Sequence, residues 1–176
     1  MKKRLTDFFI KKGVNRLINS PANRNHRFLS LKEAHDILIF YETKDRDEIE
    51  PCLETLRMLR KNVQVCLFSS GKVLPEEKDS YLIIEDGKDV NRLGYPTTNI
   101  SKKVNAVKAD ILIDLTRKNC YPMKYLMLQH PSIFKIGLKR GNEQDIYDLA
   151  ILVTDRDDMM YLFGQIIFYL QTIRSK

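Results

Sequence analysis

The sequence predicts a three-layer α/β domain with a mostly parallel sheet of five or six strands. Residues 37–41 (ILIFY) and 63–68 (VQVCLF) are strand-like runs on either side of a helical segment, residues 44–61, which gives a β-α-β unit. Residues 109–116 (ADILIDLT) are apolar on both faces, as is typical of a central strand covered by helices on both sides.

The remaining elements extend this order toward a Rossmann-like fold. We expect strands at residues 81–84, 134–138 and 147–153, and helices at residues 99–107, 122–129 and 159–174, where apolar side chains recur every three or four positions. Residues 72–79 are expected to form a loop or a short helix, and residues 141–144 a loop. Ser30 and Glu33 have capping-box spacing and predict a short helical turn before the first strand.

The N-terminal segment differs from the rest of the chain in charge. Residues 1–35 contain nine Lys or Arg and two acidic residues, so the whole net charge of +7 lies there. We predict a basic helix over residues 1–18, with a bend at Gly13, followed by a linker. The domain organisation is therefore 1–35, a basic N-terminal helix and linker, and 36–176, a single α/β domain.

The basic segment has two interpretations. It is either a helix packed on the body with its cations in water, or a surface that binds an anionic ligand, nucleic acid or membrane lipid. The candidate cations are Lys11, Lys12, Arg16, Arg24 and Arg27. If Phe8 and Phe9 are exposed, a homodimer contact through this helix is also possible.

The cysteines and the hydropathy indicate a cytoplasmic protein. Cys52, Cys66 and Cys120 are three widely spaced residues without zinc-ligand spacing, so we expect reduced thiols. No apolar run approaches the length of about 20 residues that a transmembrane helix needs. Lys11 and Lys12 interrupt the apolar start, so we expect no secretory signal.

Ligands of open parallel sheets bind at the carboxyl ends of the strands, near the point where the strand order reverses. The polar residues that follow the predicted strands are therefore the candidate ligand-binding residues. They are Glu42, Thr43, Ser69, Ser70, Gly71, Asp114, Thr116 and Arg117, with Lys118, Lys139 and Arg140 beside them.

Each of these candidates also has a structural interpretation. Ser69 to Gly71 could bind a phosphate or simply form a turn, and Asp114 could pair with Glu42 for acid-base work or cap the turn that follows it. Neither a P-loop nor a G-x-G-x-x-G motif occurs, and the three histidines share no spacing with a cysteine. We therefore predict no catalytic residue, no metal site and no cofactor.

Five phrases, HDILIFYE, ADILIDLT, FKIGLKR, YDLAILV and QIIFYLQTI, in this order resemble an uncharacterised family of small α/β proteins from Bacteroidetes. The same strands are distantly similar to the N-terminal Rossmann-like half of heptosyltransferase-type glycosyltransferases. That resemblance implies a sugar-nucleotide enzyme. However, this chain has Glu42-Thr43-Lys44-Asp45 in place of the Gly-Asp loop of those enzymes, and no room for their second domain.

Three classes of function remain for this bacterial-type sequence. The one we favour is a small cytoplasmic, non-catalytic binding or interaction protein. The first alternative is a nucleotide- or sugar-nucleotide-binding enzyme that uses the strand-end residues. The second is a protein that binds nucleic acid or a membrane surface through residues 1–35.

Overall fold

The structure is a computed structural model that describes residues 2–20 (side chains from Thr6 onward), 24–71, 81–117, 119–141, 145–154 and 156–174. Three predicted features lie outside these ranges: the loop or short helix at residues 72–79, the candidate residue Lys118, and residues 142–144 of the loop predicted at 141–144.

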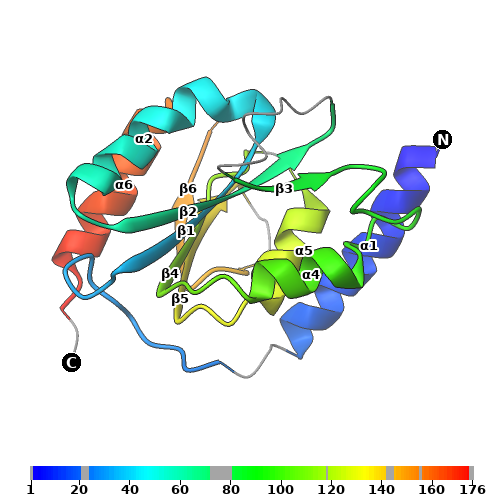
Figure 1. Cartoon of the computed structure of the whole chain (residues 1–176), viewed down its shortest axis with the longest axis horizontal. Helices are drawn as coiled ribbons and strands as arrows, with labels where there is room; N and C mark the ends of the chain where they lie inside the picture. The colour runs from blue at the N-terminus through cyan, green and yellow to red at the C-terminus, as the bar shows by residue number, and fades with distance from the viewer. Residues whose placement is uncertain are drawn as a thin grey trace.

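The sheet has six parallel strands in the order β3-β2-β1-β4-β5-β6 (Figure 1). The strands are β1 (Asp36–Glu42), β2 (Asn62–Ser69), β3 (Leu82–Glu85), β4 (Ile111–Asp114), β5 (Phe134–Lys139) and β6 (Leu149–Leu152). The predicted Rossmann-like α/β fold is thus confirmed. The sheet grows outward in both directions from the β1·β4 pair.

Helices cover both faces of the sheet. The helices α2 (Arg46–Met58) and α6 (Met159–Thr172) lie on one face, and α4 (Thr98–Asn105) and α5 (Tyr121–Gln129) lie on the other (Figure 1). The basic helix α1 (Lys2–Asn19) packs along α5. No helix in the described part of the chain is long and apolar enough to cross a membrane.

The alternation of side chains along β1 explains its uninterrupted apolar sequence. Ile37, Ile39 and Tyr41 face the core under α2 and α6. Leu38 and Phe40 face the core under α4 and α5. Because helices bury both faces, neither set of positions tolerates a polar residue.

Local signals in the sequence explain where the helices begin. A short 3-10 turn, η1 (Thr43–Asp45), leads from β1 into α2, and acidic residues occupy the first turn of α2. The side chain of Asp158 caps α6 by accepting a hydrogen bond from the Tyr161 N–H (3.1 Å). The Ser30 N–H donates to the Glu33 carboxylate (3.1 Å), as the capping-box spacing predicts, and the Ser30 hydroxyl donates to the same carboxylate (2.7 Å).

The bend expected at Gly13 was wrong, because α1 continues unbroken through this residue. Gly13 instead makes room for the ring of Tyr95. A Cβ atom at this position would lie 2.4 Å from Tyr95 Cε1. The Tyr95 hydroxyl donates to the carbonyl of Phe9 (2.8 Å) and fastens α1 to the segment before α4.

Two strands are shorter than predicted, β4 and β6, and polar side chains beside them make contacts with other segments. The carboxylate of Asp110 accepts hydrogen bonds from the N–H groups of His35 and Asp36, just before β4. Tyr147 lies outside β6, and its hydroxyl reaches β4.

The linker also contributes to the core, since Leu29, Leu31 and Ala34 are buried under α6 and its neighbours.

Candidate functional site

The order of the strands reverses between β1 and β4, and their carboxyl ends carry the candidate residues Glu42 and Asp114. In doubly wound sheets of order 3-2-1-4-5-6, this reversal point is where ligands bind, because the chains leaving the two strands diverge to opposite faces. We refer to this region as the switch point. The strand order could not be deduced from the sequence, so the structure alone brings these residues together.

Asp114 is completely buried and holds the end of β4 together. Its Oδ1 accepts hydrogen bonds from the N–H (3.0 Å) and the hydroxyl (2.7 Å) of Thr116. Its Oδ2 accepts one from the hydroxyl of Tyr147 (2.7 Å). Burial raises the pKa of Asp114, while the bonds from Thr116 and Tyr147 oppose that rise. The bonds from Thr116 are those expected of a carboxylate that caps the turn following its strand.

Tyr147 reaches Asp114 because Gly137 on β5 has no side chain. A Cβ atom at Gly137 would lie 2.3 Å from the Tyr147 ring. Gly137 pairs directly with Asp114 in the β4·β5 register, so the ring crosses β5 and ends at the carboxylate. Sequence reasoning missed Tyr147, since nothing in the pattern links positions 114 and 147 except a glycine inside a strand.

The Ser-Ser-Gly segment after β2 forms a turn. The hydroxyl of Ser69 bonds both the carbonyl (3.1 Å) and the N–H (3.3 Å) of Gly71, while Ser70 and Gly71 are exposed. The hydroxyl of Thr43 donates to the carbonyl of Phe68 (3.2 Å) and ties the end of β1 to β2. These groups already make the hydrogen bonds that they would offer to a phosphate.

Three charged side chains at the switch point each keep one buried polar atom that has no hydrogen-bond partner among the described residues. These atoms are Oε1 of Glu42, Oδ2 of Asp45 and Nε of Arg117. Two of these side chains form ion pairs through another atom. Oε2 of Glu42 pairs with Lys44 (2.7 Å), and Nη2 of Arg117 pairs with Glu48 (2.5 Å). Asp45 is only 8% exposed.

Asp45 is close enough to its neighbours for their charges to act on it. Burial raises the pKa of its carboxyl, and the negative charges of Glu42 and Glu48 raise it further. The positive charges of Lys44 and Arg117 lower it. The switch point is thus a cluster of mixed charge. Sequence reasoning included Glu42 and Arg117 and missed Asp45 and Glu48, although both follow directly in the run E-T-K-D-R-D-E.

Arg24 is separate from the other candidate cations. Its guanidinium donates to the carbonyl of Ile133 (2.8 Å) and pairs with Asp148, which also accepts the N–H of Lys135. Burial, with the charge of Arg24, lowers the pKa of the Lys135 ammonium to about 8. This cluster lies near the amino end of β5, away from the switch point. The remaining candidates are exposed: Lys11, Lys12, Arg16 and Arg27.

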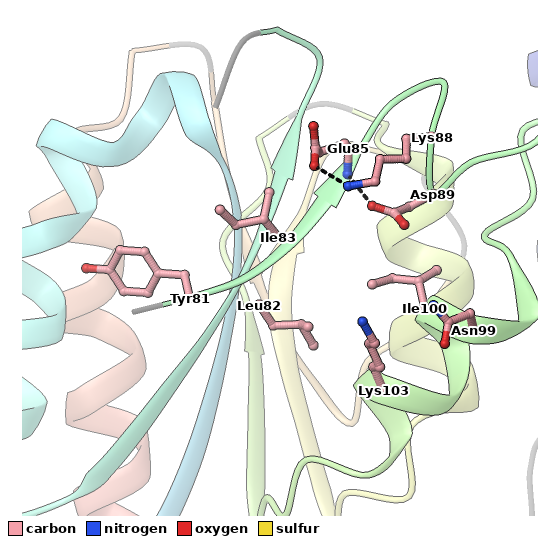
Figure 2. Close-up of a pocket in the computed structure, with 9 residues that line it drawn as sticks. All are labelled: Tyr81, Leu82, Ile83, Glu85, Lys88, Asp89, Asn99, Ile100 and Lys103. Carbon is pink, nitrogen blue, oxygen red and sulfur yellow. Dashed lines mark hydrogen bonds and ion pairs between the residues drawn. The ribbon is translucent and has the colours of Figure 1, made fainter. Parts of the chain in front are cut away.

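A cavity of about 270 Å³ lies at the open edge of the sheet, between β3 and α4 (Figure 2). Leu82 and Ile100 form its apolar floor, and Lys103 of α4 points into it. Its rim carries an ion pair between Lys88 and Glu85 (2.8 Å). Volumes of this size suit only a fragment-sized ligand, and both rim charges are already paired.

The cysteines and the buried histidine are structural. All three cysteines are buried, and burial raises the pKa of their thiols, that of Cys52 to about 12. His130 accepts the N–H of Ser132 at Nδ1 (3.1 Å). Within the described ranges, no three His, Cys, Asp or Glu side chains gather to hold a metal ion.

The strand order and the polar cluster at the switch point define a doubly wound α/β protein with a candidate ligand site at the β1·β4 reversal. The chain belongs to a family of unknown function, DUF6913, whose profile matches residues 6–173. Searches of curated proteins and of solved structures found no match.

Proposed function

We propose that this protein is a non-catalytic binding protein that holds a small ligand at the switch point. The observation that carries the proposal is the set of three buried, unpartnered polar atoms at Glu42, Asp45 and Arg117. Buried polar groups are normally hydrogen-bonded, because leaving one unpaired costs about 1–3 kcal/mol. Three such atoms at the expected ligand position of this fold indicate a missing partner.

The three atoms specify the chemistry of that partner. Two carboxylate oxygens accept hydrogen bonds, and the guanidinium Nε–H donates one. A bare cation satisfies only the carboxylates, and a bare phosphate satisfies only Arg117. A hydroxyl-rich molecule that also carries an acceptor, such as a sugar or the ribose of a nucleotide, satisfies all three.

The contacts of Asp114 favour binding over catalysis. A general acid or base needs a free oxygen directed at the substrate. Both oxygens of Asp114 accept bonds from Thr116 and Tyr147, which leaves its carboxylate as part of the scaffold. The alternative of a nucleotide- or sugar-nucleotide-binding enzyme uses the same site. It requires Glu42 or Asp45 to act on the bound molecule.

A thermal-shift screen of sugars, nucleotides and sugar nucleotides tests the proposal. A ligand at 100 times its Kd stabilises the fold by about 2.7 kcal/mol, which raises the Tm by about 5–10 °C in a domain of this size. The shift should disappear in Asp45→Asn and Arg117→Lys and persist in Asp86→Asn, an exposed acid that follows β3 at the same edge of the sheet. A hit that ignores the first two substitutions places the ligand elsewhere and refutes the proposal.

The Tm of the ligand-free protein distinguishes a ligand-binding role of Asp45 from a structural one. Because burial raises the pKa of Asp45, its ionised form destabilises the fold at neutral pH. Asp45→Asn should therefore raise the Tm of the ligand-free protein while removing the ligand response. Incubating each hit with the protein and measuring its mass distinguishes the enzyme alternative, which converts the ligand.

A second candidate function rests on the exposure of Lys11, Lys12, Arg16 and Arg27. These cations support nucleic-acid or anionic-membrane binding through the N-terminal segment. Such binding weakens steeply as salt rises, by a factor that grows with the number of phosphates contacted. Lys11→Glu/Lys12→Glu should abolish it, whereas Lys102→Glu/Lys103→Glu on α4 should not.

The cellular setting belongs to the same proposal. Three buried cysteines without a disulfide among them support a reducing compartment, the cytoplasm of a bacterium. An origin in Bacteroidetes and a relationship to glycosyltransferase half-domains remain hypotheses. The strand order supports the second only at the level of fold.

A further inference from the structure

The helix α6 is apolar on the side that faces solvent as well as on the side that faces the core. Its 14 residues (MMYLFGQIIFYLQT) include no charged side chain. Tyr161 and Phe168 are each 60% exposed, Tyr169 is 45% exposed, and Met160 is 44% exposed. A helix that is hydrophobic all round is normally buried on all sides, and none of the described residues covers the outer face of α6.

We propose that this face is the contact surface of a homodimer in which two copies of the chain meet about a two-fold axis. The dimer face consists of the exposed side of α6 together with the adjoining exposed side of α2, which lies beside α6 on the same face of the sheet (Figure 1). It comprises Glu54, Met58, Arg60, Met160, Tyr161, Gly164, Phe168 and Tyr169.

The charges of α2 select a second copy as the partner. Exposed acids, Asp47 and Glu54, lie in the first nine residues of α2, and exposed Arg60 lies just beyond its end. Arg57 takes no part, because it pairs with Glu50 of the same chain (3.2 Å). A two-fold axis perpendicular to the helices makes the two α2 helices antiparallel. The acidic half of each α2 then faces the basic end of the other, so the surface is complementary to itself.

The distribution of charge argues against the alternative faces. Phe8 and Phe9 are also exposed, but they lie on α1 beside Lys11 and Lys12, and a two-fold contact there would bring the same cations together. A dimer through α6 keeps the two basic segments on its outer sides, because α1 and α6 lie on opposite sides of the sheet (Figure 1). For the same reason, the basic segment and the aromatic face cannot lie on one membrane together.

The area of the dimer face suits such a contact. Three aromatic side chains of about 150–250 Å² each, exposed to these extents, present about 250–400 Å². Each partner of a standard interface buries about 800 Å², and Met58 (76% exposed) and Met160 add apolar area to that of the three aromatic side chains. Gly164 lies in the middle of the face with nothing within 4 Å of a Cβ atom, so a second helix can approach closely there.

Sedimentation equilibrium of the full chain tests the proposal. The wild-type protein should sediment as a dimer, and Phe168→Asp should raise the dimer dissociation constant at least about 30-fold, as the loss of an interface anchor does. Gly164→Gln is the second variant, because the open space around Gly164 allows it to fold while the added side chain blocks close approach. Phe8→Asp on α1 is the matched control and should remain dimeric.

Charge reversal tests the antiparallel arrangement. Glu54→Lys should weaken the dimer, and adding Arg60→Glu to the same chain should restore part of the affinity. A wild-type protein that is monomeric at every accessible concentration overturns the proposal. So does a dimer that Phe168→Asp and Gly164→Gln leave unchanged, or a monomer whose Phe168 mediates binding to anionic vesicles.

Discussion

The protonation of His130 should lower the free energy of unfolding of this protein at acidic pH. Its imidazole is completely buried between the end of α5 and the segment before β4. Nδ1 accepts the N–H of Ser132 (3.1 Å), so Nε2 carries the proton that it shares with the carbonyl of Val107 (3.1 Å). The neutral ring is therefore the form that fits, and burial lowers its pKa from 6.5 to about 4.

The magnitude follows from proton linkage. A histidine whose pKa is lower in the folded than in the unfolded state takes up its proton mainly on unfolding. Its contribution to stability is complete above about pH 6.5 and is lost as the pH falls toward 4. With 1.36 kcal/mol per pKa unit, the loss is about 2 kcal/mol between pH 7 and pH 5 and about 3 kcal/mol by pH 4.

Urea denaturation at pH 7, 6 and 5 measures this effect. The free energy of unfolding of the wild type should fall toward that of His130→Gln by about 2 kcal/mol over this range. His35→Gln, which removes an exposed histidine, is the control and should keep the wild-type pH dependence. An NMR titration of the His130 ring gives its pKa directly, even if His130→Gln folds poorly. A ring that titrates near 6.5 would refute the reasoning.

Three further substitutions test individual contacts by their effect on the free energy of unfolding, measured by urea denaturation. Tyr147→Phe removes the hydroxyl that bonds Asp114 and should cost about 1–3 kcal/mol, because a buried carboxylate oxygen loses its donor. Gly137→Ala should displace the Tyr147 ring and cost at least as much, and the double variant should lose less than the sum of the two losses, since both changes break the same hydrogen bond. Gly13→Ala should fail to give the roughly 1 kcal/mol that helix propensity offers, because Tyr95 must move, and Gly13→Ala in a Tyr95→Ala background should recover it. Additive losses for the first pair, or a gain for Gly13→Ala alone, would show that these rings do not occupy the positions described.

The sequence alone determined the fold class and most element positions, because burial leaves a periodic record. Runs such as 37–41 and 111–113 are apolar on both faces of the strand because helices cover both faces of the sheet. The acids before α2 and α6 likewise marked the beginnings of helices. Such signals are local, so neighbouring residues are sufficient to reveal them.

Tertiary structure decided the strand order and the contacts that define the candidate site. The sequence placed Asp114 at a strand end, but only the packing of Tyr147 across Gly137 shows that its oxygens are occupied. Asp45 and Arg117 come from different strand ends, and their proximity depends on β4 lying beside β1. The role of Gly13 was also not predictable from the sequence, because the ring of Tyr95, 82 positions away, determines it. Contacts between distant segments leave no periodic pattern, and for that reason the sequence could not reveal them.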